Sequence, residues 1–437
     1  MKKILLVILV GLLVALSPEA HAIEVGGMYY GINSDSTTVF VTYGPNKYRG
    51  DITIPNTIAY EGKTYTVSSI GHSAFSGCND LTSVAMGNTI NFIGSDAFSS
   101  CLSLRAVTIG QSVKTIANFA FYGCSALTEI IIPDNVTTIG ESICSYCNSL
   151  TSATIGDGAT GIGYRAFMGC RKLKEITIGK NVAFIGDEAF YNCTGLTKVN
   201  IKDLAAWCLI DFDGSAAANP LCYAHHLFLD GQEIKDLVIP ETISEIRNFT
   251  FTGGSGFTSI DLGHVTSIGW ASFASCTGLE TINFGKSLTT IGNSAFGGCT
   301  GLKSLTFPRS LTEIGYYAFQ ECDSLTSVRC LSIIPPELHE GTTFSEICYR
   351  KATLTVPKNS ISNYTVGWCE WRAFRHIVEW QFHECDVNCD GEVNIADINM
   401  IIEAILSGRS GDIYDVNYDS EINIADVNEV IHMILTI

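Results

Sequence analysis

Apolar residues return to the same places every 23 residues over most of this 437-residue chain. Each unit opens with an isoleucine and reads Ile-Gly-x-x-Ala-Phe-x-x-Cys-x-x-Leu-x-x-Val-x-Ile, with small substitutions. A strict period of about two dozen residues is typical of a solenoid, because each unit can bury its apolar face only against its neighbours. The isoleucines that open the units are Ile70, Ile93, Ile116, Ile139, Ile162, Ile185, Ile246, Ile268, Ile291 and Ile314.

The end of each unit predicts a short strand. In the unit that closes with Ile176 and Ile178, apolar and polar residues alternate, which places both isoleucines on the inward face. The alanine, phenylalanine and cysteine of the phrase supply the other wall, where phenylalanine fills the centre. The glycine after each opening isoleucine, such as Gly71 or Gly94, predicts either a positive φ or a close backbone approach.

The outward strand positions are mostly short and polar. They carry no aromatic stripe, which lowers the expectation of sugar stacking without removing it. A solvated sheet face and a protein-binding face explain this composition about equally well. The positions include Ser83, Glu129, Thr154, Glu175, Thr177, Asn200, Asp261, Asn283, Ser304 and Arg329.

Nine of the 17 cysteines occupy the same place in their units. We expect them to form one buried column of free thiols, because stacked side chains point in parallel and an odd column cannot pair completely. Outside the column, Cys385 and Cys389 are near enough in sequence to pair with each other or with Cys369, and the sequence does not choose. The nine are Cys78, Cys101, Cys124, Cys147, Cys170, Cys193, Cys276, Cys299 and Cys322.

Residues 202–242 interrupt the period with about 38 extra residues. One interpretation is a binding excursion on the rim of the solenoid. The other, which we prefer, is an irregular rung that keeps the core continuous. The pair His225 and His226 with Cys222 is too small a cluster to predict a metal site with any weight.

The two ends of the chain differ from the repeats. Residues 1–22 read as a secretory signal, with Lys2 and Lys3, an apolar run and an Ala-His-Ala cleavage site, so we expect an exported, extracellular protein. The formal net charge is −18, and from Glu384 onward twelve acidic residues face only Arg409. This balance argues against nucleic acid or an anionic membrane as a partner and predicts a bound cation at the C-terminal end.

Two acidic loops 29 residues apart carry the spacing of a calcium (Ca2+) site. Each places oxygen donors at loop positions 1, 3, 5, 7, 9 and 12, and each feeds an amphipathic helical pattern. Gly391 permits the sharp turn at position 6 of the first loop, whereas Ser420 stands there in the second and weakens that site by about 1 kcal/mol. The predicted ligands are Asp386, Asn388, Asp390, Glu392, Asn394, Asp397, Asp415, Asn417, Asp419, Glu421, Asn423 and Asp426.

The 23-residue phrase resembles the BspA-type leucine-rich repeat of bacterial surface proteins, matched in about ten units. The resemblance implies a right-handed α/β solenoid with short parallel strands, in which residues 70–201 and 243–330 form the repeats. Residues 23–69 resemble the N-terminal segment of such proteins and residues 331–380 their closing segment, so both are expected to cap the array.

The duplicated loop and helix of residues 381–437 resemble a type I dockerin, a small all-α domain that binds calcium and docks onto a cohesin domain. Loop positions 10, 11, 17 and 18 carry partner recognition in that family. An alternative is a calcium-stabilised cap that serves only the solenoid. In either case we expect folding of residues 381–437 to depend on calcium. The recognition positions correspond to Ile395, Ala396, Ile402, Glu403, Ile424, Ala425, Ile431 and His432.

The sequence gives little support to catalysis. The histidines are scattered without ligand spacing, and the cysteines of the repeats are expected to be buried and unreactive. We therefore expect a secreted or surface-attached, non-catalytic adhesion protein whose solenoid binds an extracellular protein or glycan. The rival hypothesis is an accessory subunit of a cohesin-assembled complex for polysaccharide breakdown. A third, weaker one is an inhibitor or immune decoy.

Overall fold

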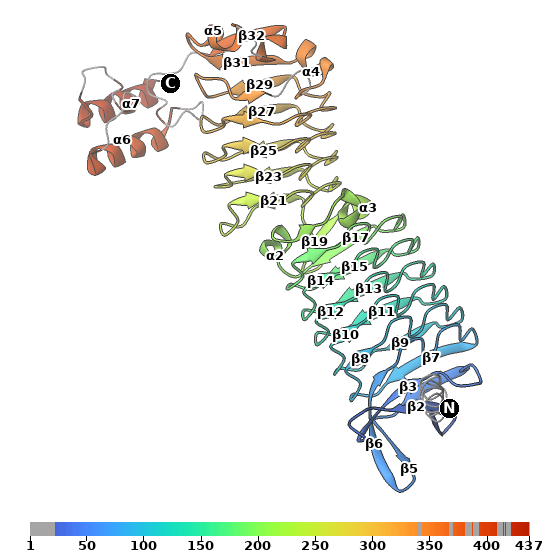
Figure 1. The fold of residues 1–437 in the computed structure, drawn as a ribbon. Helices are drawn as coiled ribbons and strands as arrows, with labels where there is room; N and C mark the ends of the chain where they lie inside the picture. The colour runs from blue at the N-terminus through green and yellow to red at the C-terminus, as the bar shows by residue number, and fades with distance from the viewer. Residues whose placement is uncertain are drawn as a thin grey trace, which may run out of the picture.

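The protein is a stack of rungs, and its computed structural model describes residues 22–338, 343–366, 370–380, 387, 393–408, 414, 416 and 421–436. Figure 1 shows the rungs following one another from the N-terminal strands to the C-terminal ones, with two further helices beside the last rungs. One continuous cluster of buried apolar residues extends from Met28 to Phe374 and forms the interior of the stack. The predicted solenoid with short parallel strands is confirmed.

Most rungs contribute one longer strand and one strand of two residues. The longer strands are β4 (Gly50–Ile54), β7 (Leu81–Met86), β9 (Ala106–Thr108), β11 (Glu129–Ile132), β13 (Ser152–Ile155), β15 (Glu175–Ile178), β17 (Lys198–Ile201), β19 (Leu227–Leu229), β21 (Asp236–Val238), β23 (Ser259–Asp261), β25 (Thr281–Asn283), β27 (Ser304–Phe307) and β29 (Ser327–Cys330). The two-residue strands are β8 (Phe92–Ile93), β10 (Thr115–Ile116), β12 (Thr138–Ile139), β14 (Gly161–Ile162), β16 (Phe184–Ile185), β18 (Asp211–Phe212), β22 (Glu245–Ile246), β24 (Ser267–Ile268), β26 (Thr290–Ile291), β28 (Glu313–Ile314) and β30 (Glu337–Leu338).

Successive strands pair in parallel with a register that repeats the sequence period. Glu175 of β15 lies opposite Ser152 of β13 and Lys198 of β17, so equivalent positions stack directly. Within β15 the side chains alternate, and Ile176 and Ile178 are buried as predicted. The period-2 alternation of a strand therefore sends one isoleucine pair per rung into the core.

A ladder of phenylalanines fills the centre of the stack. The rings of Phe98 and Phe121 are nearly parallel, with centroids 5.2 Å apart, and Phe273 and Phe296 repeat this geometry at 5.2 Å. Phenylalanine is replaced by Cys144 in one rung, where Ile143 takes the place of the usual alanine and both side chains are buried. The larger isoleucine therefore offsets part of the volume that the smaller cysteine loses.

The cysteines form a second buried column beside the phenylalanines. The thiols from Cys101 onward each donate to a carbonyl of the preceding rung, as Cys124 Sγ does to Phe98 O at 3.0 Å and Cys299 Sγ to Phe273 O at 3.2 Å. All nine column cysteines are free and buried, as predicted. Cys369, Cys385 and Cys389 lie outside the described residues, so their pairing stays open.

The segment between the glycine and the cysteine of each unit forms a third wall, here called the turn wall. Its backbone is laddered to the next rung: Phe119 N donates to Glu141 O at 2.9 Å, and Phe121 N donates to Ile143 O at 2.8 Å. Two positions of each turn wall have positive φ. They are the third residue after the opening isoleucine, as at Phe119 (φ 60°), and the seventh, as at Tyr146 (φ 61°).

The glycine that follows the opening isoleucine serves close approach. A Cβ on Gly94 would lie 2.7 Å from the carbonyl carbon of Gly71 in the preceding rung, and no positive φ occurs at either glycine. Of the two explanations that the sequence left open, the tight contact between rungs is therefore the one that applies.

Residues 202–242 complete an enlarged rung. The segment contains α2 (Leu204–Cys208), a 3-10 turn η2 (Ala216–Ala218), α3 (Leu221–Ala224) and β20 (Gln232–Glu233), which forms a hairpin with β19. Its strands β18 and β19 continue the two columns of the first half. Trp207 Nε1 donates to Thr250 O at 3.1 Å and Asn219 Nδ2 to Phe249 O at 2.7 Å, both buried, which ties the next rung to it.

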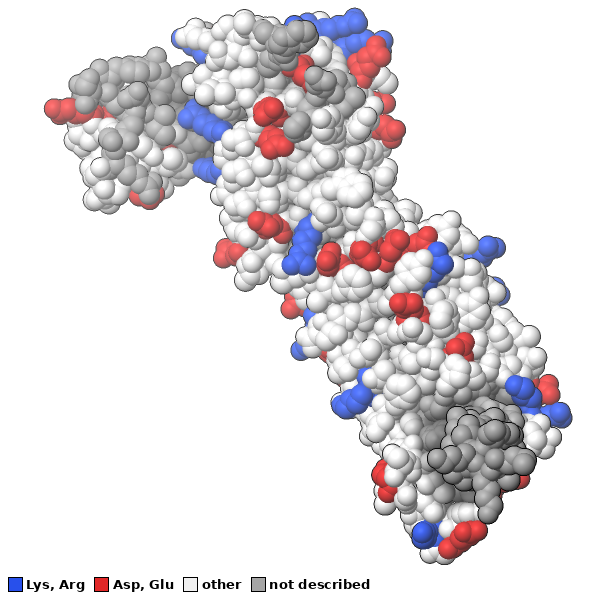
Figure 2. Space-filling view, in the orientation of Figure 1, with Lys and Arg blue, Asp and Glu red and all other residues white. Residues whose placement is uncertain are grey.

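The strand ladders are interrupted at the insertion, as they also are between β9 and β11, between β12 and β14 and between β25 and β27. Among the described residues, no strand up to β20 is hydrogen-bonded to a strand from β21 onward. The two halves of the solenoid are therefore joined by a continuous core and by side-chain hydrogen bonds rather than by a continuous sheet. Figure 2 shows that acidic side chains gather across the middle of the visible face, in the region of this junction.

Both ends of the stack are closed by additional strands and aromatic side chains. At the N-terminal end, the ring of Tyr48 packs 4.6 Å from that of Phe75 and continues the phenylalanine ladder. At the C-terminal end Trp371 is buried and donates to Pro336 O at 2.8 Å. The closing elements are β1 (Ile23–Val25), β2 (Met28–Ile32), β3 (Thr38–Thr42), β5 (Thr57–Tyr60), β6 (Lys63–Ile70), α4 (Glu346–Lys351), β31 (Thr353–Pro357), α5 (Ile361–Thr365), η3 (Glu370–Ala373) and β32 (His376–Trp380).

Two helices of equal length form the C-terminal module. They are α6 (Ile395–Ser407) and α7 (Ile424–Thr436), related by the 29-residue repeat of the sequence. They pack around their own small core, which is separate from that of the solenoid and consists of Val387, Ile398, Ile401, Val416, Val427 and Val430. The predicted all-α C-terminal unit is thus present.

Candidate functional site

Each C-terminal helix begins with the same hydrogen-bonded cap. Asn394 accepts from Ala396 N at 2.8 Å, and Asp397 accepts from Asn394 N at 2.8 Å. One repeat later, Asn423 accepts from Ala425 N at 2.7 Å, and Asp426 accepts from Asn423 N at 2.8 Å. The last two donors of each predicted calcium loop thus also begin its helix, which fixes the direction of both side chains.

The acid at position 12 of each loop is fully buried. Asp397 and Asp426 have no exposed surface, and Asp426 also accepts from Val416 N at 2.8 Å, which ties the loop to the helix. A carboxylate removed from water is expensive unless charge or hydrogen bonds compensate it. A divalent cation beside these carboxylates would supply that charge, so the described donors fit calcium, which prefers hard oxygens.

Five of the twelve predicted ligands can be placed: Asn394, Asp397, Glu421, Asn423 and Asp426. The other seven lie outside the described residues, namely Asp386, Asn388, Asp390, Glu392, Asp415, Asn417 and Asp419. Within the described part of the chain, no three His, Cys, Asp or Glu side chains come together as a metal site. The complete ligand set therefore stays a prediction.

The predicted partner-binding positions form an exposed face on the two helices. Ile395 and Ile424 are 66% and 65% exposed, and Ile402 and Ile431 are each 38% exposed. Exposed isoleucines in a domain with so small a core are costly unless a partner covers them. Among the remaining positions, Ala396, Glu403 and His432 are exposed and Ala425 is partly buried.

Two leucines belong to this face and were missed by the sequence reasoning. Leu406 is 83% exposed and Leu435 is 79% exposed, and each lies eleven residues after the first isoleucine of its helix. The spacing of i, i+7 and i+11 places the three apolar residues of each helix on one stripe. The sequence does contain an indication of these residues, because the two leucines are separated by the same 29 residues as the two loops.

The strand face of the solenoid is polar, as predicted. On its N-terminal rungs Asp51 accepts from Ser83 Oγ at 2.6 Å and from Thr82 Oγ1 at 2.8 Å, and these bonds lower the pKa of Asp51. Further along, Lys202 Nζ lies 2.8 Å from Asp157 Oδ1, and the bond from Lys202 lowers the pKa of Asp157. The contacts of Asp51 join neighbouring rungs, whereas the pair of Lys202 and Asp157 reaches across an intervening rung.

Exposed aromatic residues gather on the turn wall, whereas the strand face has Phe228, whose ring centre lies 4.8 Å from Lys198 Nζ. The ring of Tyr122 makes edge contacts with Phe119 at 5.9 Å and with Tyr146 at 5.6 Å, and the Arg165 guanidinium lies 4.6 Å from the ring centre of Tyr164. The sequence reasoning tested only strand positions for an aromatic stripe, so it missed this group.

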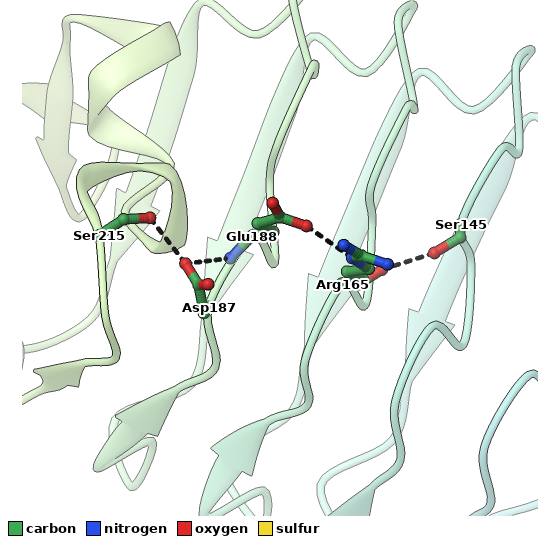
Figure 3. Close-up of polar contacts among 5 residues, drawn as sticks. All are labelled: Ser145, Arg165, Asp187, Glu188 and Ser215. Carbon is green, nitrogen blue, oxygen red and sulfur yellow. Dashed lines mark hydrogen bonds and ion pairs between the residues drawn. The ribbon is translucent and has the colours of Figure 1, made fainter.

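A chain of polar contacts crosses four rungs beside these rings. Figure 3 shows Ser145 Oγ donating to Arg165 O at 2.6 Å, and Arg165 Nε 2.5 Å from Glu188 Oε2. In the next rungs Asp187 accepts from Glu188 N at 2.9 Å and from Ser215 Oγ at 2.6 Å. The bond to Glu188 raises the pKa of Arg165 and holds the guanidinium over Tyr164.

The buried thiols are poor candidates for nucleophiles. Burial raises the pKa of Cys193 and of Cys208 to about 12, and it also raises the pKa of Cys170. A thiol in this state is protonated at neutral pH and shielded from substrates. The column therefore supplies packing rather than reactive thiols.

Comparison with known proteins identifies both parts of the chain. Residues 62–174, 144–206 and 224–364 match the family described as BspA type leucine rich repeat region, in six copies. These segments span more than half of the sequence. The chain belongs to the BspA-type leucine-rich-repeat family. Residues 384–435 match the dockerin type I domain.

Several solved structures resemble this BspA-type chain. A leucine-rich repeat protein from Bacteroides ovatus is 23% identical, with 82% of this chain and 99% of that one covered and a TM-score of 0.46. A leucine rich cell surface protein from Faecalibacterium prausnitzii is 26% identical, with 83% and 95% covered and a TM-score of 0.41.

The pneumococcal vaccine antigen PcpA is 17% identical, with 84% of this chain and all of that chain covered and a TM-score of 0.50, which shows a shared fold. None of the curated proteins compared with the chain matches it. Both matching domains are non-catalytic, and no enzymatic domain is found.

The described helices are all too short or too polar to cross a membrane. The predicted secretory signal, residues 1–22, falls almost entirely outside the described residues, so export stays a prediction. BspA-type repeats and dockerins are typical of extracellular or surface proteins, which agrees with that prediction.

Proposed function

We propose that this protein is an exported, non-catalytic binding protein whose C-terminal module attaches it, in the presence of calcium, to a cohesin-type partner. The observation that carries the proposal is the duplicated apolar stripe, Ile395, Ile402 and Leu406 on α6 and its equivalents on α7. Six large apolar side chains are exposed on two helices, and a buried aspartate holds the first turn of each helix. Such a surface is suited to binding a partner.

Calcium would act on this surface indirectly in the proposed arrangement. When bound, it supplies positive charge to the loop carboxylates. Asp397 and Asp426 then hold the first turns of α6 and α7, and Val387 and Val416 pack between loop and helix. The orientation of the two apolar stripes depends on these contacts, so removal of calcium is expected to abolish docking.

The solenoid would be the part that recognises an extracellular protein or glycan. Its long, laddered surface is the kind of extended face that repeat proteins use for binding. The dockerin match also favours a second candidate, a non-catalytic subunit of a cohesin-assembled complex, in which the solenoid contacts a neighbouring component. A role in polysaccharide breakdown would follow only if that complex carries such enzymes.

The test is binding of the full chain to a purified type I cohesin, measured by surface plasmon resonance with calcium and with EGTA. Because the stripe is present twice, Leu406→Asp and Leu435→Asp are combined. We expect binding with calcium, loss with EGTA and at least about a hundredfold weakening in the double variant. The matched control replaces Asn399 and Asn428, exposed on the same helices, with alanine. Calcium-independent binding, or equal loss in the control, would contradict the proposal.

A further inference from the structure

The exposed rings on the turn wall form one contiguous group, here called the aromatic patch: Phe119, Tyr122, Tyr146 and Tyr164, with Arg165. Ring contacts link the first three, and in the next rung the Arg165 guanidinium lies 4.6 Å from the ring centre of Tyr164, while Arg165 O accepts from Ser145 Oγ, the neighbour of Tyr146. The patch spans three successive units of the first half of the solenoid. Phe119, Tyr146 and Tyr164 are all exposed, so the rings present their surfaces to solvent.

Nothing in the repeat requires aromatic side chains at these places. The position of Phe119 holds Asp96 and Ser142 in the units before and after it, and the position of Tyr146 holds Gly123 and Gly169. Both positions build the same backbone with small residues. Aromatic residues recur at the position of Phe119 as Phe249 and Tyr317, so the fold permits these rings without requiring them.

Two of the aromatic residues are held at a conformational cost. Phe119 and Tyr146 have φ values of 60° and 61°, a left-handed conformation that costs a residue with a side chain about 1 kcal/mol relative to glycine. The ring of Tyr146 recovers part of this cost by packing over Gly169, where an added Cβ would lie 2.8 Å from the ring. Every unit has this conformation at both places, including Tyr317 (φ 58°), so the conformation belongs to the fold, and what distinguishes Phe119 and Tyr146 is their contact with Tyr122.

The charges around the patch indicate the chemistry of its partner. Asp96 lies in the rung before Phe119, and Glu141 lies in the rung after it, where Glu141 O accepts from Phe119 N at 2.9 Å. Among the described residues, neither Asp96 nor Glu141 forms an ion pair, whereas Arg165 is neutralised by Glu188. The Phe119 end of the patch therefore combines an exposed ring with carboxylates that form no ion pair, whereas Arg171 and Lys172, beside Gly169 at the Tyr146 end, also form none among the described residues.

We infer that the aromatic patch binds a basic segment of a partner protein, with arginine or lysine side chains seated over the rings and flanked by Asp96 and Glu141. Ring faces attract cations, and tyrosine is enriched in the residues that dominate protein interfaces. The inference rests on the proposed role of the solenoid as the recognition part and names the class of partner. A neutral glycan would use the rings but would leave the carboxylates without a role.

The test uses the full chain and a short peptide of alternating arginine and serine, with an alternating glutamate and serine peptide as the charge control. The patch variant combines Phe119→Ser with Tyr146→Gly. Serine and glycine occupy the equivalent positions of neighbouring units, so we expect both substitutions to preserve the fold. The matched variant combines Tyr316→Asn with Tyr317→Ser, exposed on the turn wall of the second half and replaced by the residues found at Asn293 and Ser294.

We expect the basic peptide to bind about tenfold more weakly to the patch variant, and unchanged to the matched variant. Glu141→Gln should weaken binding further and reduce its dependence on salt. Equal binding of the basic peptide by all variants would overturn the inference. It would also be overturned if the patch variant kept peptide binding but lost self-association or binding to a neutral oligosaccharide. Cohesin docking is measured in parallel, and we expect the patch variant to bind cohesin as the unchanged protein does. If the unchanged protein does not bind cohesin, that result contradicts the docking proposal alone.

Discussion

The solenoid and the C-terminal module hold their folds by different means. In the solenoid one apolar core runs from Met28 to Phe374, and successive rungs add stacked phenylalanines and thiols to it. Among the described residues of the module, six form its core and two carboxylates, Asp397 and Asp426, are withdrawn from solvent. A long repeat array stabilises itself through its neighbours, whereas the small acidic unit is expected to need a ligand.

We expect the largest difference between the two regions at alkaline pH, where the free energy of unfolding of the solenoid falls. Burial raises the pKa of column thiols such as Cys170 and Cys193, so the unfolded chain releases these protons first. Stability is full below about pH 8.5 and falls as the pH rises toward the folded values, by about 1.4 kcal/mol per pH unit for each such thiol. The helices α6 and α7 contain no cysteine and lack this sensitivity.

Urea unfolding followed by circular dichroism at pH 7 and at pH 10 measures the difference. We expect the solenoid to lose most of its stability at the higher pH. Replacing Cys170 and Cys193 with alanine should make the pH dependence shallower, at some cost in stability at pH 7. Equal stability of the unchanged protein at both pH values would contradict the buried-thiol description.

Calcium removal is the converse test, because it should affect only the module. We expect EGTA to abolish the thermal transition of α6 and α7 and to leave that of the solenoid in place, since a ligand stabilises only the state that binds it. Differential scanning calorimetry of the full chain resolves the two transitions. A solenoid that melts together with the module in EGTA would indicate that the module is a structural cap instead.

Two phenylalanines two residues apart sharpen the comparison within the solenoid. Phe121 is buried and stacks on Phe98 at 5.2 Å, whereas Phe119 is exposed on the turn wall. Phe121→Ala should cost about 3–5 kcal/mol of unfolding free energy, because it leaves a cavity in the ladder. Phe119→Ala should change it by no more than about 0.5 kcal/mol. Similar costs in chemical denaturation would show that the exposed ring has a structural role.

The smallest expected effect compares the two calcium loops. Ser420 stands at the sixth loop position, where the first loop has Gly391. Ser420→Gly should tighten the weaker site by about 1 kcal/mol, or about fivefold, because glycine adopts the sharp turn without strain. Isothermal titration calorimetry of calcium binding measures this change. Two equally strong sites in the unchanged protein would contradict the premise that Ser420 weakens the second loop.

The sequence was sufficient where one rule repeats. The 23-residue period predicted the solenoid, alternation at Ile176 and Ile178 predicted the inward face, and the cysteine column was found as expected. Ile395 and Ile424, which the 29-residue repeat places at equivalent positions, are exposed, and their role in partner binding stays a prediction. The assignment of residues 1–22, of the cap boundaries and of all twelve calcium ligands stays a prediction.

The sequence was insufficient where the variable positions of the phrase matter. Two of its unspecified places have positive φ in each unit, yet they hold residues as different as Phe119, Ser142 and Gly169, so composition did not reveal them. The interruption of both strand ladders at the insertion could not be foreseen either, because it depends on how Trp207 and Asn219 meet the next rung. These are tertiary choices that a one-dimensional pattern does not contain.

The central claim is that the C-terminal helices are a calcium-dependent docking module carried by a solenoid that needs no ligand. Hydrogen exchange of the full chain, compared in calcium and in EGTA, tests it most directly. We predict that amides of the module core, such as Ile401 and Val430, lose protection in EGTA while those of the rungs, such as Phe121, keep it. Unchanged protection of Ile401 and Val430 without calcium would contradict the account.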